Sequence, residues 1–366
     1  MKKLCLLAGL SALIFASCTK SEPQPVDLND RVVIEFTTVK EAVTNRSGLY
    51  TSENVHKVNA VNLYAFKLDA GSGDYLWEQT IEIPWTLALD SKTYQLAPGL
   101  LTAGATYKLM AVGFENAAHY TLTTLDNTVN YDNFSASSAA ANRPDINSAI
   151  FTGTSTIEVG TEGGGRSSIL MKRKVAGLLG YFVNVPAFVG NQAVEVIAIV
   201  IEDNTTGKAN LTVNLSTGLG SNPRTGKTSL MAVDLRGMET VERPDGSFVF
   251  TGNNPGDAIV KQPNTILNGS FIIPALQVSL KLAIGTITSD NQLGVLQEWP
   301  IIMTNDQSLT FDLTANNFYT LGSKPTAGTV NGDNPIDLDN ITSVSMTVSP
   351  DWESIYDLDV QDPVIP

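Results

Sequence analysis

The chain has 366 residues, of which 43% are hydrophobic and 16% are charged, and its formal net charge is −14. This hydrophobic fraction excludes an intrinsically disordered chain, and the length suffices for two domains that each bury a core. The strongly acidic balance repels phosphate backbones, so we expect no nucleic acid partner. Thr, Ser, Asn and Gly are abundant, and this composition favours strands and turns over long helices.

The first 17 residues have the pattern of a signal peptide. Lys2 and Lys3 precede an apolar run over residues 4–16, and the small residue Ser17 stands directly before Cys18. The run is too short to be a membrane-spanning helix. We expect a bacterial lipoprotein precursor that is cleaved before Cys18 and lipidated on its thiol. The alternative is an ordinary secretory signal followed by an incidental cysteine.

Residues 18–30 have the composition of a tether, with serine and two prolines that space a folded body from a bilayer. Cys5 and Cys18 are the only cysteines, and Cys5 is removed with the signal. The mature chain therefore has no disulfide, no thiolate nucleophile and no thiolate metal site. We expect it to be held at a membrane by its lipid alone.

Strand patterns follow one another through the first half of the mature chain. A Gly-rich turn over 69–74 predicts a hairpin between strands at 60–68 and 75–83. Further strands are expected at 31–39, 93–96, 106–114 and 150–159. The apolar stretch 169–185 fits a strand or a helix by period, but the aromatic and β-branched residues in its second half favour a strand, which Pro186 ends.

The second half continues in the same style, and residues 194–202 give its strongest strand pattern. Other strands are expected at 210–215, 247–251, 265–274, 277–287, 294–302, 308–313 and 318–321. Turn residues recur about every 8–12 residues, which is typical of an all-β sandwich. We expect an all-β fold with two immunoglobulin-like β-sandwich domains, at 31–185 and 186–366. The Gly-rich segment 161–168 is the alternative division.

Residues that carry chemistry are scarce. His56 and His119 have no partner at metal-ligand spacing, and we interpret both as polar surface residues. Residues 220–229 end like a phosphate-binding loop, but the glycine required at the start is misplaced and a strand, not a helix, follows. We therefore predict no catalytic residue, no cofactor and no enzymatic activity.

Two further features have a binding interpretation beside a structural one. Asp333, Asp337 and Asp339 offer oxygen ligands of the kind that calcium accepts, but their spacing is not that of an EF-hand, so we expect a solvated acidic loop without metal. The four tryptophans could form a sugar platform, whereas packing in the core is the expected role of most of them. They are Trp77, Trp85, Trp299 and Trp352.

Several stretches occur together in a particular order after the lipoprotein signal. They are residues 32–36, a loop at 45–48 with an arginine, 101–116, 170–185 and an alternating strand with Asp-Trp at 344–353. This order resembles the fimbrillin-type pilus subunits of Bacteroidales, the type V pilus family. The resemblance spans nearly the whole mature chain.

The resemblance implies an outer-membrane lipoprotein precursor with two transthyretin-like β-sandwich domains. It also implies that an arginine-specific protease removes the first strand of a polymerising subunit. The C-terminal strand of a neighbouring pilus subunit then fills the vacated groove. In this chain, the matching cleavage site lies between Arg46 and Ser47, in a polar loop of the kind in which proteolysis is easiest.

The candidate donor strand is at 341–360, with Val344, Met346 and Val348 on one face. A later apolar run within it, Ile355, Leu358 and Val360, follows Trp352. Two alternatives stay open. Residues 341–360 can be an ordinary terminal strand of the same sandwich, and Arg46 can be a plain surface arginine. The position in a pilus also stays open between shaft, tip and basal anchor. Two rival functions are a surface glycan-binding lipoprotein and an accessory domain of a cell-surface hydrolase.

Overall fold

The computed structural model describes residues 31–38, 58–86, 91–140, 144–202, 207–256, 259–289, 292–339 and 341–349. Regular structure in these residues is almost entirely β, and the helices among them are single 3-10 turns at Ala117–His119 and Tyr131–Asn133. No helix in this part of the chain is long and apolar enough to cross a membrane. The all-β fold expected from the sequence is confirmed.

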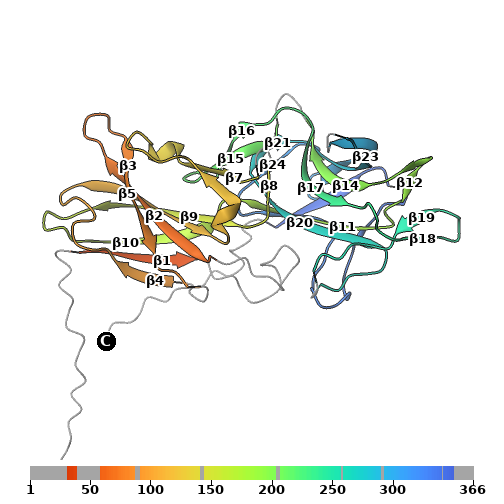
Figure 1. The fold of residues 1–366 in the computed structure, drawn as a ribbon, viewed down its shortest axis with the longest axis horizontal. Helices are drawn as coiled ribbons and strands as arrows, with labels where there is room; N and C mark the ends of the chain where they lie inside the picture. Colours follow the sequence, from red (N-terminus) through yellow and green to blue (C-terminus); the bar gives the residue numbers. More distant parts are fainter. Residues whose placement is uncertain are drawn as a thin grey trace, which may run out of the picture.

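A seven-stranded sheet forms the first lobe, on the left in Figure 1. Its strands, in spatial order, are β3 (Tyr75–Ile83), β2 (Ala60–Leu68), β5 (Thr106–Phe114), β9 (Ile150–Glu158), β10 (Gly165–Arg173), β1 (Val32–Thr38) and β4 (Ser91–Gln95). β2 and β3 pair antiparallel across the Gly-rich turn, so the predicted hairpin is confirmed.

A ten-stranded sheet forms the second lobe. Its path runs β17 (Thr228–Asp234), β14 (Val196–Ile201), β22 (Leu280–Ile287), β23 (Leu293–Met303), β27 (Val344–Ser349), β25 (Phe318–Leu321), β11 (Ala176–Val183), β20 (Thr265–Ile272) and β8 (Asp145–Ile146), and β26 (Ile336–Asp337) pairs with β11 beside this path. β14 is buried along its whole length, as its continuous apolar pattern predicts.

Four smaller sheets complete the architecture. The four-stranded sheet has the order β16 (Gly220–Pro223), β15 (Asn210–Asn214), β7 (Ser135–Ser138) and β6 (Tyr120–Leu122). Strand pairs are formed by β12 (Phe188–Val189) with β13 (Gln192–Ala193), β18 (Thr240–Glu242) with β19 (Phe248–Phe250), and β21 (Ala275–Val278) with β24 (Phe311–Leu313). Because β6 and β7 pair with β15 and β16, this sheet joins segments far apart in sequence.

The chain changes sheets between β10 and β11. β10 ends at Arg173 in the seven-stranded sheet, and β11 begins at Ala176 in the ten-stranded sheet. The apolar stretch 169–185 therefore contains two strands in different sheets rather than one. The sheets divide about ten residues before residue 186, and the domain boundary at 186 stays a prediction.

The two lobes share one apolar cluster. Phe66 and Ile169 from the seven-stranded sheet pack in the same cluster as Tyr181 and Phe271, which belong to the ten-stranded sheet. Arg173 lies fully buried at this junction, with its guanidinium carbon 5.2 Å from the ring centre of Phe151 and 5.7 Å from that of Phe271. Continuous packing of this kind fixes how the lobes sit against each other.

Candidate functional site

The first strand lies inside the sheet of the first lobe rather than at its edge. β1 runs parallel to β10, where Ile34 is opposite Ser167, and antiparallel to β4, where Ile34 is opposite Tyr94. The ladder continues beyond the strand, because Leu96 N donates a hydrogen bond of 2.9 Å to Val32 O. β10 and β4 meet only through β1.

β1 also fills part of the core of the first lobe. Val32, Ile34 and Phe36 point inward and are buried, and Ile34 and Phe36 have no exposed surface at all. Glu35, between them, is exposed. We call the space that this strand occupies between β10 and β4 the β1 slot. An empty β1 slot would expose two rows of backbone donors and acceptors together with an apolar trough.

The residues expected to anchor and process the chain lie outside the described residues. These are Cys18 in the tether and Arg46 and Ser47 in the segment that links β1 to β2. The described strands nevertheless place β1 on the N-terminal side of that segment. A cut between Arg46 and Ser47 would therefore separate β1 from the rest of the chain.

The last described strand, β27, lies inside the ten-stranded sheet of its own chain. It runs parallel to β23, with Val344 opposite Ile301, and antiparallel to β25, with Met346 opposite Leu321. Thr304 supports it from the side, because its Oγ1 donates a hydrogen bond of 2.9 Å to Met346 O. β27 thus has two strand neighbours, as β1 has.

The side chains of β27 alternate as the sequence predicts. Val344 and Met346 are buried, and Val348 packs partly buried against the same core cluster. Ser345 and Thr347 face outward and are exposed. The three residues named for the candidate donor strand therefore share one face, which here belongs to this chain's own core. Positions 350–360 of that candidate lie outside the described residues.

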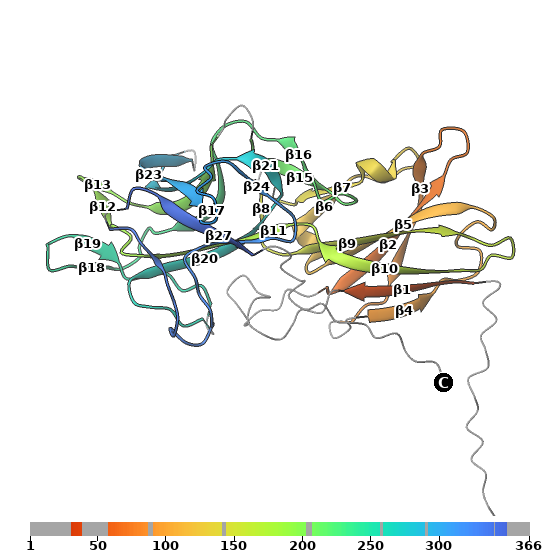
Figure 2. The ribbon, with the colours of Figure 1, turned by 180° about the vertical axis from the view of Figure 1, so that it is seen from behind.

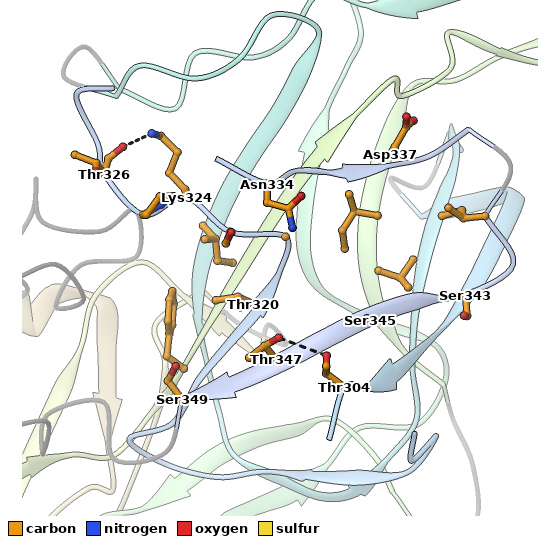
Figure 3. A pocket seen from close by; sticks show the side chains of 18 residues that line it. Thr304, Thr320, Lys324, Thr326, Asn334, Asp337, Ser343, Ser345, Thr347 and Ser349 are labelled. Carbon is orange, nitrogen blue, oxygen red and sulfur yellow. Dashed lines mark hydrogen bonds between the residues drawn. The ribbon is translucent and has the colours of Figure 1, made fainter. Parts of the chain in front are cut away.

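A groove of about 760 Å³ lies beside the outer face of β27, next to β25 and β26. Hydroxyl groups from Thr304, Thr320 and Thr347 line it, as Figure 3 shows. The groove exists because β25 ends at Leu321 and the chain turns away at Gly322, whose φ is +78°. A Cβ at Gly322 would lie 2.6 Å from the Tyr181 carbonyl oxygen, so glycine is required at this turn.

A buried ion pair holds the segment that follows Gly322. Lys324 Nζ lies 3.0 Å from Asp333 Oδ1, and both side chains are fully buried. Lys324 also donates to the backbone oxygens of Thr326 and Thr329. Tyr181 OH donates a hydrogen bond of 2.8 Å to Asp333 Oδ2, and burial raises the pKa of this tyrosine. The pair therefore ties one wall of the groove to β11.

The three aspartates of the acidic loop have separate protein partners. Asp333 pairs with Lys324, whereas Asp337 Oδ1 accepts a hydrogen bond of 2.9 Å from Asn184 Nδ2. Asp339 lies 2.6 Å from the guanidinium of Arg243. Within the described ranges, no three His, Cys, Asp or Glu side chains are placed to hold a metal ion together.

The remaining sequence candidates are dispersed. Trp299 is buried and its Nε1 donates to Ile341 O at 3.1 Å, and Trp77 and Trp85 are half-buried against the core of the first lobe. These three rings form no exposed platform. His119 lies on a 3-10 turn with Nδ1 3.0 Å from Ser148 Oγ. Trp352 and His56 lie outside the described residues.

Sequence reasoning did not indicate the Lys324–Asp333 pair or the groove. Lys324 stands in a polar turn, and lysine and aspartate are seldom fully buried. The glycine at 322 was the one local signal of a special backbone position. Whether a turn is covered by other segments is a property of the tertiary fold, which local patterns do not contain.

The described part of the chain is an all-β protein in which β1 and β27 each lie between two strand neighbours. A family model for the fimbrillin-A associated anchor proteins Mfa1 and Mfa2 matches residues 31–355. The chain belongs to this family. The resemblance to Bacteroidales fimbrillin-type subunits is thereby confirmed, and membership indicates a fimbria-associated protein of the cell surface. A search of curated proteins finds none that matches.

Solved structures resemble the chain distantly. The fimbrial anchor protein Mfa2 from Porphyromonas gingivalis has 12% identity and a TM-score of 0.38, over 87% of this chain and 97% of that one. A candidate polysaccharide-binding protein from Bacteroides thetaiotaomicron has 13% identity and a TM-score of 0.41, over 85% of this chain and 99% of that one. A candidate cell adhesion protein from Parabacteroides distasonis has 11% identity and a TM-score of 0.43, over 88% of this chain and 96% of that one. Likeness at this level does not bear on function.

Proposed function

We propose that this chain is a structural, non-enzymatic subunit of an adhesive cell-surface fimbrium. It is exported as an outer-membrane lipoprotein through Cys18, and it is joined to a neighbouring subunit at the β1 slot. The observation that carries the proposal is the position of β1. It is the first strand of the body, it is buried between β10 and β4, and the segment with Arg46 follows it.

Exchange at the β1 slot follows from elementary energetics. Cleavage after Arg46 frees the segment 18–46, which carries the lipid and β1. Loss of Ile34 and Phe36 exposes apolar surface, and loss of the ladder leaves backbone groups of β10 and β4 without strand partners. A strand from a neighbouring subunit repairs both defects at once, which is β-strand addition.

The strand that this chain gives to a neighbour comes from the candidate donor at 341–360. β27 has the alternation that the slot requires, because Val344, Met346 and Val348 repeat the two-residue spacing of Val32, Ile34 and Phe36. Donation of β27 would, however, open this chain's own sheet between β23 and β25. We therefore assign donation to the later run, Ile355, Leu358 and Val360, which the chain can give away while β27 stays in place.

A second role of the same site is basal anchoring. This role is favoured by the pairing of β1 with β10 along its whole length and with β4 from Val33 to Thr37. The description of the family as anchor proteins favours it as well. In this role β1 and the lipid stay attached, and the chain holds a fimbrium to the outer membrane. The two roles differ in one observable, the first residue of the mature protein.

The N-terminal residue of protein isolated from cells tests these roles. A mature chain beginning at Ser47 supports strand exchange, and one beginning at lipidated Cys18 supports the anchor. Arg46→Lys should block an arginine-specific protease, whereas the matched change of an exposed arginine in the second lobe, Arg236→Lys, should not. Cleavage of the Arg46→Lys variant at an unchanged rate would remove Arg46 from the proposal.

Assembly is tested on the trimmed protein. Trimmed chains should form multimers that survive detergent at room temperature, because separation requires extraction of a whole strand. A chain that keeps β1 should stay monomeric under the same conditions and serves as the control. If the trimmed chain stays monomeric at high concentration and binds glycans tightly, the glycan-binding alternative replaces the fimbrial one.

A further inference from the structure

A small cavity of about 250 Å³ opens at the junction of the lobes, away from both the β1 slot and the groove beside β27. Its walls come from the end of β10, the loop before β16, the start of β21 and the turn after β24. Figures 1 and 2 both show β16, β21 and β24 near the middle of the molecule. We call it the waist cavity.

The waist cavity is cationic although the protein is acidic. Its titratable lining residues are Lys172, Arg173 and Lys174, and no Asp or Glu lines it. Lys174 Nζ donates one described hydrogen bond, 3.3 Å long, to Ser216 O. Burial, and then the charge of Lys172, lower the pKa of Lys174. Within the described residues, no carboxylate oxygen lies within 4.0 Å of this ammonium. A bound anion would compensate it.

An unsatisfied acceptor lies in the same wall. Asn316 is only 9% exposed, and its Oδ1 is buried without a hydrogen-bond partner. Its backbone is left-handed, with φ at +63°, and is held by a hydrogen bond of 3.0 Å from Asn316 N to Val175 O. Buried polar atoms in folded proteins nearly always have a partner, and this oxygen has none among the described residues.

The mouth of the cavity adds apolar surface. Leu219 and Leu276 line it and are each 52% exposed. The cavity thus offers two ammonium groups, one acceptor oxygen and two aliphatic side chains, and its volume suits a ligand with a single sugar-sized ring. Pockets that hold larger ligands are typically about 300–1,000 Å³.

We propose that the waist cavity binds the acidic unit of a glycan, a sugar ring that carries a carboxylate. The carboxylate lies between Lys172 and Lys174, a ring hydroxyl donates to Asn316 Oδ1, and the C–H face of the ring packs on Leu219 and Leu276. A simple inorganic anion would satisfy the lysines but would leave Asn316 and the leucines unused. A neutral sugar would leave the lysines uncompensated.

Calorimetry on the full chain in detergent tests the proposal with glucuronate, glucose, acetate and sulfate as probes. Glucuronate should bind at least about tenfold more tightly than either glucose or acetate, because each of these lacks half of the contacts. Lys174→Met, which keeps the aliphatic stem, should weaken glucuronate binding about tenfold. The matched control Lys67→Met changes a half-exposed lysine of the first lobe that pairs with Glu78, and it should leave binding unchanged.

Two further variants separate binding from folding. Lys172→Met changes an exposed residue, so its loss of glucuronate affinity supports the site even if Lys174→Met fails to fold. Asn316→Gly keeps the left-handed backbone and removes the acceptor. It should weaken glucuronate binding and leave acetate binding unchanged.

Three outcomes would overturn the proposal. Sulfate or acetate that binds as tightly as glucuronate would indicate a plain anion site. Glucuronate binding that survives both lysine changes would place the sugar elsewhere. Absence of binding by any of the four probes at millimolar concentration would leave the cavity without this role. The cell-surface role at the β1 slot is independent of all three results.

Discussion

The charge of Lys324 is stable inside the protein only because of the groups around it. Its ammonium group is fully buried, yet it meets a carboxylate and two backbone oxygens. Desolvation of a charge costs several kcal/mol, and these contacts offset that cost only while all of them are present. The wall of the groove beside β27 therefore rests on one pair of charges.

Removal of either partner should be strongly destabilising. Lys324→Met leaves Asp333 buried without its counter-ion, and we expect the free energy of unfolding to fall by about 3–5 kcal/mol. Denaturant titration of Lys324→Met, Asp333→Asn and the double variant measures this. The double variant should lose less than the sum of the single losses, since neither charge is then left alone. Additive losses would mean that the two charges do not interact.

The lowered pKa of the Glu298 carboxyl group predicts that the stability of the fold depends on pH. Hydrogen bonds from Lys227, at 2.7 Å, and from Lys281 lower the pKa of this carboxyl group. A carboxyl whose pKa is lower in the folded state stabilises the fold above its unfolded pKa of about 4.3, and this contribution is lost as the pH falls through the folded value.

Glu298→Gln should therefore reduce the free energy of unfolding at about pH 7, and the difference from the parent protein should shrink at about pH 3. Denaturant titrations at both pH values measure it. Glu242→Gln, a change of an exposed glutamate in β18, controls for the loss of one negative charge. An equal difference at both pH values would contradict the lowered pKa.

At the scale of elements, β1 and β27 have the same local geometry. Each is parallel to one neighbour and antiparallel to the other. A strand inserted in this way completes a sheet that already exists on both sides of it. The chain therefore has two positions at which one terminal strand closes a lobe.

Two truncations test which part of the C-terminal region the fold needs. A stop after Asn340 removes β27 and should destabilise the second lobe, since burial of Val344 and of Met346 contributes about 1.5–3 kcal/mol each. A stop after Ser349 keeps β27 and should leave the unfolding temperature unchanged. The second variant should also lose the ability to donate a strand. If it still donates, the donor lies within β27.

Strand positions were largely predictable, because the two-residue period and the turn chemistry are local. The bounds expected for β2, β3 and β5 agree with the structure. The stretch 169–185 is different, because its apolar side chains belong to strands of two sheets, and the apolar pattern alone does not mark the change of sheet between Arg173 and Ala176. The pairing of β27 with β23 and β25 is non-local as well, so the sequence could not distinguish a donor from a strand of the same lobe.

At the scale of the whole molecule, the proposed lipid on Cys18 would decide where the protein is held. Cys18→Ala should abolish labelling of the precursor by a fatty-acid analogue and its retention in the membrane fraction. Cys5→Ala is the matched control and should leave labelling intact, since cleavage before Cys18 would remove Cys5 with the signal. Unchanged labelling of the Cys18→Ala variant would contradict the lipoprotein assignment.

The direction of β1 has a mechanical consequence. Both ribbon views show that the strand begins at the end of the first lobe that is farthest from the second lobe and runs toward the second lobe (Figures 1 and 2). In a chain that is tethered through Cys18 and keeps β1, tension between the membrane and the distal lobe acts along the strand axis. The ladders to β10 and β4 are then loaded in shear, so that their bonds share the force instead of breaking one after another. A basal anchor with this geometry resists detachment under flow.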